Sequence, residues 1–278
     1  MKCIFVSDLH GKIDKYEKLF HLVKTEVPDI LFLGGDLLPH SNVYKNFIEK
    51  YLLKNLLKIR STLKRNHPII FLILGNDDAR YEEEEIIKYS NLGYWNYINQ
   101  KKIVIDNSSF YGYNFTPPSP FILKDWEKYD VSRFTEPGCI SPEEGKRTIE
   151  IPEQEKKFST IKNDIDTLIG DDDLSNSIFL FHGPPYKTNL DIAAIAGKFI
   201  DHVPLDPHVG SIAIKKFIET RQPLLTLHGH IHESSRISGN WKDKIGNTFC
   251  FSAAYDGPEL SLIKFNTEKL DQAERFLI

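Results

Sequence analysis

Short apolar runs alternate with longer segments of helical periodicity in the first third of the chain. The runs at residues 2–6, 30–33 and 69–74 are short, sharply bounded and apolar, which is the pattern of buried strands. Between them, apolar residues recur with helical spacing at 13–27 and from about 43 to 63. This alternation of strand and helix predicts an α/β fold with parallel strands at its core.

The rest of the chain repeats these patterns in shorter segments. No internal repeat or linker interrupts their order, so we expect one domain that spans residues 1–278. The predicted elements are a short helix from about 82, a strand pair at 103–105 and 110–113, a helix at 153–169, a strand at 178–181, a helix at about 211–220, a buried strand at the start of 223–232, and a final strand pair at 247–252 and 260–265.

The segment from about 114 to 152 differs from the rest of the chain. It holds six prolines, and neither strand nor helical periodicity survives in it. It also lacks the apolar residues that a separate hydrophobic core would need. We therefore expect a Pro-rich flap or excursion of the single domain at about 114–152.

Composition excludes several classes of protein. The formal net charge is −4, whereas a nucleic-acid binder usually shows a basic excess, so a nucleic-acid partner is not expected. No apolar run approaches the roughly 18–20 residues that a membrane span needs. The three cysteines form no C-x-x-C pair, which suits a reducing compartment. We expect a cytoplasmic protein without a membrane partner; a homo-oligomer stays possible.

Polar residues follow the predicted strands at the points where the strands end. In parallel sheets, functional groups gather at the carboxyl ends of the strands. The run 223–228 is followed by Gly229, which allows a tight turn, and then by His230 and His232. Residues i and i+2 face the same side, so these two imidazoles can point into one space. The residues at five strand ends are Asp8, His10, Asp36, Asn76, His182, His230 and His232.

This set of side chains predicts a metal centre. Its mixture of nitrogen and oxygen ligands suits the divalent transition metals Mn, Fe and Zn. The set is too large for one tetrahedral ion and large enough for two ions that share one carboxylate. Two such ions, two carboxylates and a bridging hydroxide leave a charge of about +1, which favours an anion that gains charge in its transition state. Hydrolysis of a phosphoryl ester is the reaction that this centre would serve.

The ordered motifs carry a family resemblance. They are D-x-H at 8–10, G-D at 35–36, G-N-D-D at 75–78, a lone His182 and G-H-x-H at 229–232. Together they resemble the calcineurin-like metallophosphoesterase superfamily. Segments 119–130, 182–191 and 208–234 further resemble its small bacterial and archaeal branch, often called cyclic-nucleotide-phosphodiesterase-like.

The resemblance implies a fold and a ligand set. The expected fold is α/β, a two-sheet β-sandwich flanked by helices in four layers (αββα). Asp36 would bridge the two ions, opposite the water or hydroxide that attacks phosphorus. One ion would be bound by Asp8, His10, Asp36 and His232, and the other by Asp36, Asn76, His182 and His230.

Two positions depart from the family pattern. The protein Ser/Thr phosphatases carry an arginine shortly after the bridging aspartate, whereas residues 37–40 here hold none, so that subclass is not expected. The residue after Asn76 is usually a histidine that binds the phosphoryl group and assists the leaving group. Here it is Asp77, which should stay ionised near two cations and make a poor proton donor. Our hypothesis is a preference for good leaving groups, or a proton from water or His202; alternatively, Asp77 has only a structural role.

Three functions follow from these patterns. The first is a metal-dependent phosphoesterase that acts on a small phosphodiester or phosphomonoester. The alternatives are a nuclease of the same superfamily, which the lack of a basic, aromatic platform disfavours, and a catalytically weak, metal-bearing scaffold for a partner protein. The catalytic candidates are Asp36, Asn76, Asp77 and His202, and the candidates for substrate contact are Asn76, Asp77 and His202.

The other histidines are assigned ordinary roles. His228 lies beside the G-H-x-H motif but outside its frame, so we expect a packed residue. His40 belongs to no motif and is expected to be solvated. His208 lies, like His202, between two metal motifs and could reach substrate.

Overall fold

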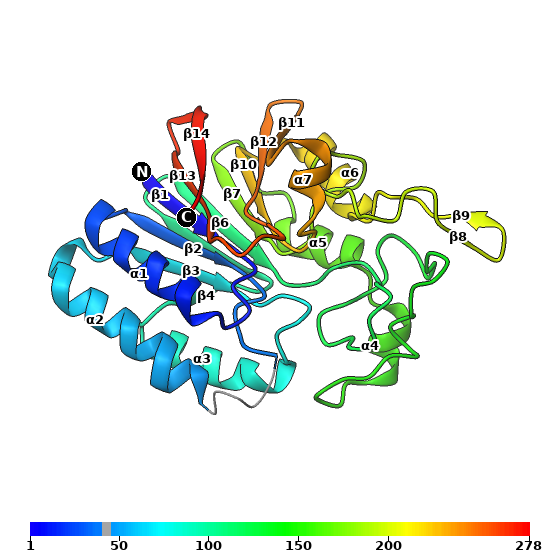
Figure 1. Cartoon of the computed structure of the whole chain (residues 1–278), viewed down its shortest axis with the longest axis horizontal. Coiled ribbons are helices and arrows are strands. Elements are labelled where there is room, and N and C mark those ends of the chain that lie inside the picture. Colours follow the sequence, from blue (N-terminus) through cyan, green and yellow to red (C-terminus); the bar gives the residue numbers. More distant parts are fainter. Residues whose placement is uncertain (41–45) are drawn as a thin grey trace.

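The computed structural model describes residues 1–40 and 46–278. The start of the helix predicted from about 43 therefore lies outside the described residues. Two mixed sheets, with helices on their outer faces, organise the described chain (Figure 1).

The first sheet is built mainly from the N-terminal third. Its strands β1 to β4 run parallel, as the apolar runs predicted, and the C-terminal strands β13 and β14 add to its other edge in antiparallel pairing. The strand order is β14 (Lys269–Leu277), β13 (Ser261–Asn266), β1 (Lys2–Val6), β2 (Ile30–Gly34), β3 (Ile69–Ile73) and β4 (Asn96–Tyr97).

The second sheet has a parallel centre and antiparallel edges. Strand β10 lies between β7 and β12 and runs parallel to both. The strand order is β11 (Lys242–Ile245), β12 (Thr248–Ser252), β10 (Leu225–His228), β7 (Ser177–Phe181), β6 (Ser108–Tyr113) and β5 (Lys101–Ile105).

The predicted final strand pair is wrong. Strand β12 lies in the second sheet and β13 in the first, and each has a different antiparallel partner. Those partners, β11 and β14, are edge strands with many exposed charged residues. Their polar character hides them from a search for apolar runs, which joined the two buried strands instead.

The two sheets pack face to face through a largely aromatic layer. Alternate residues of β1, β2 and β3, including Phe5, Phe32 and Phe71, are buried against the second sheet. The rings of Phe71 and Phe110 stack across the two sheets with centroids 4.6 Å apart. The opposite faces of both sheets pack against helices, so each sheet is buried on both sides.

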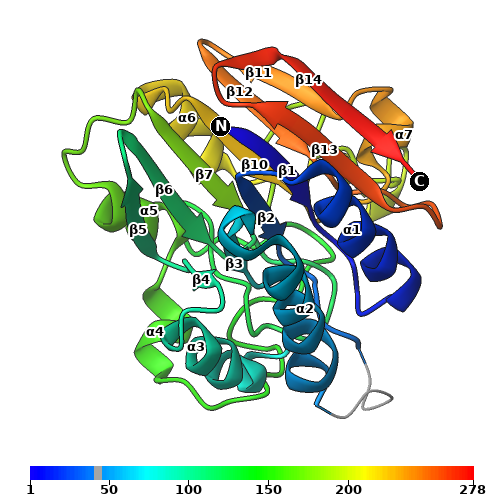
Figure 2. The same ribbon diagram turned by 90° about the vertical axis from the view of Figure 1, so that its left-hand side faces the viewer.

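Helices cover the outer faces of the sandwich. Figure 1 shows α1, α2 and α3 beside the first sheet and α5 and α6 beside the second, and Figure 2 shows α1 and α2 side by side. The predicted fold class, a two-sheet sandwich flanked by helices, is confirmed. The helices are α1 (Ile13–Glu26), a π-helical segment (Ile48–Leu53) that leads into α2 (Lys54–Leu63), 3-10 turns at Lys64–Asn66 and Arg80–Glu82, α3 (Glu83–Asn91), α4 (Glu153–Phe158), α5 (Ile161–Ile169), α6 (Ile212–Arg221) and α7 (Ser234–Ser238). None of the described helices is long and apolar enough to cross a membrane.

The helix predicted at 153–169 is two helices. Ser159 has extended backbone angles, and Thr160 caps α5 by accepting a hydrogen bond from the backbone N of Asn163 at 3.2 Å. A threonine before a helical segment is a strong N-cap signal, and it ends the preceding turn here.

Two long segments border the strand ends, and we call residues 114–152 and 186–210 the rim. Residues 114–152 contain no helix or named strand and are held by isolated bridges such as Thr116 to Glu127. Trp126 is fully buried, and its indole nitrogen donates to the carbonyl oxygen of Asp78 at 2.8 Å. The second segment contains the short hairpin β8 (Phe199–Ile200) and β9 (Val203–Pro204), which projects from the body in Figure 1.

Candidate metal centre

The seven predicted ligands follow the carboxyl ends of strands in both sheets. Loops after β1 and β2 run side by side, because His10 N donates to Asp36 O at 2.8 Å. Loops after β7 and β10 do the same, because Gly229 N donates to His182 O at 2.8 Å. The centre therefore lies where the ends of the two sheets meet.

These side chains form two groups that share one carboxylate. Ligand atoms within each group all lie within 4.8 Å of one another, and Asp36 belongs to both groups. Asn76 lies beside the second group, with its Oδ1 3.0 Å from Nε2 of His182. The first group is Asp8, His10, Asp36 and His232, and the second is Asp36, His182 and His230. The structure thus brings all seven together, in the division that the resemblance implied; their binding of metal stays a prediction.

The backbone of the centre adopts an uncommon conformation. Asp8, His10, Asp36 and His230 have φ values of 58°, 45°, 51° and 74°. Residues other than glycine rarely adopt this left-handed region of backbone angles. Those that do cluster at functional sites, where the surrounding structure holds them in place. The two sheets therefore fix the directions in which these four side chains leave the backbone.

Glycines let the loops of the centre approach one another. A Cβ atom on Gly75 would collide with Oδ1 of Asp36, and one on Gly229 would lie 2.7 Å from Oδ2 of Asp8. The chain turns tightly after Gly229, where Ile231 N donates to the Gly229 carbonyl oxygen at 3.0 Å, but the positive φ of this turn lies at His230 and not at the glycine. Its small size instead allows the close contact between the two sheets.

Hydrogen bonds from the second sheet orient Asp8. Its Oδ1 accepts from the backbone N of His230 at 3.0 Å and lies 3.1 Å from Nε2 of His232. Burial opposes ionisation of this carboxylate, but the imidazoles of His232, His182 and His10 together outweigh it and lower the pKa of Asp8. An ionised aspartate is the form that binds a metal cation.

His182 is held with one nitrogen facing inward. Its Nδ1 lies 2.9 Å from the carbonyl oxygen of Gly34, which can only accept, so Nδ1 donates. Its Nε2 lies 3.3 Å from Oδ2 of Asp36. Burial disfavours the charged ring, but the carboxylates of Asp36 and Asp8 and the Gly34 carbonyl together outweigh it and raise the pKa of His182. A cation between Nε2 and Asp36 would take the place of that proton, so the donor set fits a divalent metal.

His228 has a structural role, as its position outside the motif predicted. It is fully buried, with Nδ1 2.9 Å from Gly183 O and Nε2 2.8 Å from Oγ1 of Thr226. Both ring nitrogens are satisfied by neighbours, which leaves neither for a metal.

His40 is solvated, as expected, with its side chain 55% exposed, but it also contacts the centre. Its ring stacks on that of His10 with centroids 4.7 Å apart, and its Nε2 lies 3.7 Å from Oδ2 of Asp77. His10, His40 and Asp77 form a third close group of possible ligands at the solvent side of the centre. No sequence motif marks His40, and its position four residues after Asp36 is the only signal that could have raised it.

The remaining candidates lie in the rim. His202 is exposed in the β8–β9 hairpin, and within the described residues no hydrogen bond or ion pair joins it to a predicted ligand. His208 is half-buried, with its Nδ1 2.8 Å from Oδ1 of Asp191. The structure does not bring His202 to the cluster, and its catalytic role stays a prediction.

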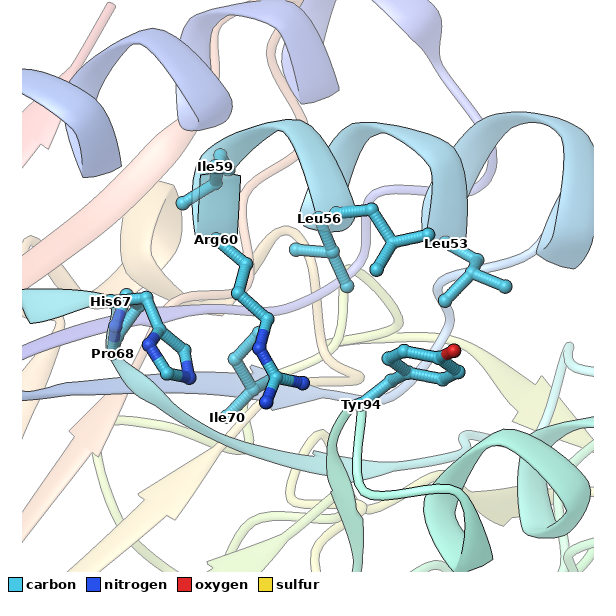
Figure 3. Close-up of a pocket in the computed structure, with 9 residues that line it drawn as sticks. Leu53, Leu56, Ile59, Arg60, His67, Pro68, Ile70 and Tyr94 are labelled. Atoms are coloured by element: carbon cyan, nitrogen blue, oxygen red, sulfur yellow. The ribbon is translucent and has the colours of Figure 1, made fainter. Parts of the chain in front are cut away.

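An apolar hollow lies away from this centre. It is formed between α2 and the amino end of β3, with Leu56, Arg60 and Tyr94 in its wall (Figure 3). The ligand-bearing loop follows the other end of β3. None of the seven predicted ligands lines the hollow.

Comparison with known proteins gives a family and a fold. A family model described as calcineurin-like phosphoesterase matches residues 1–234. The structure of TT1561 from Thermus thermophilus is 17% identical in sequence, with a TM-score of 0.58, and covers 99% of this chain and 98% of its own. A dimetal phosphatase from Danio rerio is 10% identical, with a TM-score of 0.51, and covers 100% of this chain and 98% of its own. No curated protein matches the sequence.

Proposed function

We infer that this chain, which belongs to the calcineurin-like phosphoesterase family, hydrolyses a phosphoric ester through two divalent transition-metal ions held by the seven residues of the centre. The observation that carries this proposal is that Asp36 belongs to both groups of possible ligands. One carboxylate shared by two cations is the arrangement that a two-metal hydrolase needs. The similar Danio rerio protein is described as a dimetal phosphatase, which supports the same proposal.

The protein groups prepare the site for an anionic substrate. Two bound ions of Mn, Fe or Zn would supply a bridging hydroxide and stabilise charge on the phosphoryl oxygens. Asp36 is held by the backbone N of Asp77, which donates to its Oδ1 at 2.9 Å. Its Oδ2 faces Nε2 of His182 at 3.3 Å and Nε2 of His10 at 3.9 Å. The bridging carboxylate is thus fixed before substrate arrives, which lowers the cost of reorganisation during the reaction.

We propose a small phosphodiester or phosphomonoester as the substrate. The net charge of −4 and the absence of an aromatic, basic platform in the sequence favour this class over nucleic acid. The resemblance of segments 119–130, 182–191 and 208–234 to the cyclic-nucleotide-phosphodiesterase-like branch favours a diester. The three cysteines are free, two of them buried, which suits the cytoplasmic location that we propose.

The first test is hydrolysis by the full chain. Bis(p-nitrophenyl) phosphate, p-nitrophenyl phosphate and a set of cyclic nucleotides are assayed with Mn²⁺, Fe²⁺, Zn²⁺ and Mg²⁺ in turn. The expected result is metal-dependent release of product that Asp36→Ala abolishes and Asp271→Ala leaves intact, since Asp271 is an exposed residue of β14. No turnover of any ester with any metal would contradict the proposal.

A second test addresses the residue that departs from the family. Because Asp77 should remain ionised beside two cations, we expect faster turnover of aryl esters than of alkyl esters. An Asp77→His variant, assayed at saturating metal, should gain most on the poor alkyl leaving groups. Equal losses on aryl and alkyl esters would refute this explanation of the substitution.

Two other functions stay as alternatives. A nuclease of the superfamily would degrade single-stranded DNA in the same assay conditions. A metal-bearing scaffold would bind metal without turnover; Asp77 in place of histidine favours it, whereas the retention of all seven ligands opposes it, because a scaffold does not need them. Metal-dependent turnover of a small ester without DNA degradation would exclude both.

A further inference from the structure

Asp77 touches the candidate ligands of both metal groups. Its backbone N donates to Oδ1 of Asp36, the carboxylate that the two groups share. Its two side-chain oxygens face different neighbours, Asn76 on one side and the stacked pair His10 and His40 on the other.

The first oxygen fixes the amide of Asn76. Nδ2 of Asn76 donates to Oδ1 of Asp77 at 3.3 Å. This bond turns Oδ1 of Asn76 the other way, to a position 3.0 Å from Nε2 of His182. The amide oxygen, which is the only side-chain atom of Asn76 that can ligate a cation, thereby faces the second group.

The second oxygen faces a buried nitrogen that lacks a partner. Nε2 of His10 lies on the metal side, 3.3 Å from Nε2 of His232 and 3.9 Å from Oδ2 of Asp36. Nδ1 of His10 is buried and has no hydrogen-bond partner among the described residues. The carboxylate oxygen nearest to it is Oδ2 of Asp77 at 3.8 Å, and the side chain of His10 is only 9% exposed.

In His182 and His228, by contrast, the second ring nitrogen has a hydrogen-bond acceptor. The Nδ1 atoms of both rings lie 2.9 Å from a backbone carbonyl, which fixes their tautomers. Among the described residues, no backbone carbonyl accepts from Nδ1 of His10, and Oδ2 of Asp77 is the nearest carboxylate oxygen. Metal-binding histidines nearly always donate their second N–H to a carboxylate or carbonyl, which orients the ring and makes the ligating nitrogen more basic.

We propose that Asp77 is a positioning residue that holds His10 and Asn76 in their ligating orientations, one in each metal group. Its Oδ2 accepts the Nδ1–H of His10, and its Oδ1 accepts the amide of Asn76. The side chain of Asp77 is 34% exposed, so it has room for the rotation that shortens the 3.8 Å separation to hydrogen-bond length. This inference rests on the metal-binding part of the proposed function and gives the Asp77 substitution a role in the affinity for metal.

His40 distinguishes this role from a second interpretation of the same cluster, in which the cluster binds a third cation. Its Nε2 lies 3.7 Å from the same oxygen, and its side chain is 55% exposed. A positioning role for Asp77 requires only His10 and Asn76. A third cation bound by His10, His40 and Asp77 would require all three side chains.

The test is calorimetric titration of the full chain with Mn²⁺ and Zn²⁺ after chelation and dialysis. Loss of an outer carboxylate costs about 10–100-fold in metal affinity, so Asp77→Ala should weaken both sites by that factor. Asp77→Asn keeps one acceptor oxygen and the side-chain size, so its loss should be smaller. His40→Ala and Asp271→Ala are the matched controls and should bind metal as the natural sequence does.

The second measurement reports on the His10 ring itself. In ¹⁵N-labelled protein loaded with Zn²⁺, we expect long-range ¹H–¹⁵N spectra to show His10 protonated at Nδ1, with that proton protected from solvent. Protection should be lost in Asp77→Ala, and the Nδ1 proton of His182 should be unaffected because Gly34 holds it.

The outcomes distinguish this inference from the proposed function. Unchanged affinity in Asp77→Ala overturns the inference, even if the chain hydrolyses esters. Three ions per chain, reduced to two in His40→Ala, also overturns it in favour of a third cation site. Weakened metal binding in Asp77→Ala without ester hydrolysis by the natural sequence would support the inference and refute the proposed function.

Discussion

The metal centre and the rim are neighbours that are built on different principles. The centre consists of short loops at the ends of parallel strands, with four candidate ligands in left-handed backbone conformations. The rim consists of long segments that contain few regular elements and reach the same loops through scattered hydrogen bonds, such as Trp126 to Asp78 and Ala194 to Glu233. The two sheets impose the geometry of the centre, whereas buried side chains hold the rim.

Because of this difference, we expect substitutions in the two regions to affect different properties, turnover in the centre and folding stability in the rim. Substitutions in the centre should change metal binding and turnover and should change stability only through the ions that are lost, because the sheets persist without the ligands. Substitutions at the anchors of the rim should change the free energy of unfolding first.

The largest effect is expected from His182→Ala. His182 and His228 are both fully buried histidines at the ends of neighbouring strands, but only His182 faces Asp36. We expect His182→Ala to lower kcat/KM by about 1,000-fold or more, which corresponds to about 4 kcal/mol of transition-state stabilisation. Rates measured at saturating Mn²⁺ check this.

His228→Ala is the matched control for that prediction. It removes the partners of Gly183 O and Thr226 Oγ1, so we expect a loss of about 1–3 kcal/mol in unfolding free energy. Turnover by the folded protein should stay within a few-fold of the natural sequence. Equal losses of turnover in the two variants would show that burial, and not the direction of the ring, decides the role of a histidine here.

The rim is tested through its buried ion pair. Lys124 and Glu127 contact each other with both side chains fully buried, and Glu127 also accepts from Ser119 N at 2.7 Å. Lys124→Met leaves the carboxylate of Glu127 buried without its cation, which should cost about 3–5 kcal/mol of unfolding free energy. Urea denaturation measures this loss.

The double variant Lys124→Met with Glu127→Leu sharpens the result. Replacing both charges by apolar side chains of similar volume should recover most of the loss, because no charge is then left unpaired. Metal affinity should be unchanged in both variants. A loss of metal binding in the single variant, with stability intact, would show that the rim shapes the centre directly.

Sequence reasoning brought the candidate ligands together for a physical reason, although their binding of metal stays a prediction. Asp36 and His230 directly follow apolar strands, and parallel strands deliver their carboxyl ends to one edge. The local sequence patterns were therefore sufficient to predict which distant residues meet at the site. They also contained the first sheet, whose buried strands are continuous apolar runs.

The same reasoning failed where contacts do not follow from strand position. Lys124 and Glu127 would be assigned to the surface by residue type alone, yet both are buried, because each satisfies the other. His40 reaches His10 through a loop with no periodicity, and only the folded chain shows their contact. The edge strands β11 and β14 were missed since their exposed charged residues break the apolar pattern.

Removal of metal should have an intermediate effect on stability. The centre holds two carboxylates and four imidazoles close together, and ions bound only by the folded state stabilise it by mass action. At metal concentrations about 100 times the dissociation constant, one site contributes about 2.7 kcal/mol. We therefore expect EDTA to lower Tm by several degrees, and Mn²⁺ added in excess over EDTA to restore it.

The Asp36→Ala variant is the control for metal removal. Since Asp36 belongs to both groups, this variant should show a Tm that neither EDTA nor Mn²⁺ changes. An equal response to EDTA in Asp36→Ala would place the stabilising ion elsewhere in the chain.

The smallest effect is expected from His202→Ala, which tests whether the hairpin of the rim belongs to the active site. His202 was a candidate proton donor because it lies between two metal motifs in the sequence, but the structure places it on an exposed hairpin that projects from the body (Figure 1). Surface substitutions usually change free energies by no more than about 0.5 kcal/mol, so kcat/KM should change by about twofold or less. Measurement on both an aryl and an alkyl ester is needed, because a proton donor matters most for the poorer leaving group. A selective loss on the alkyl ester would mean that the hairpin closes over the centre when substrate binds, and that the rim contributes to the chemistry which the strand ends otherwise carry alone.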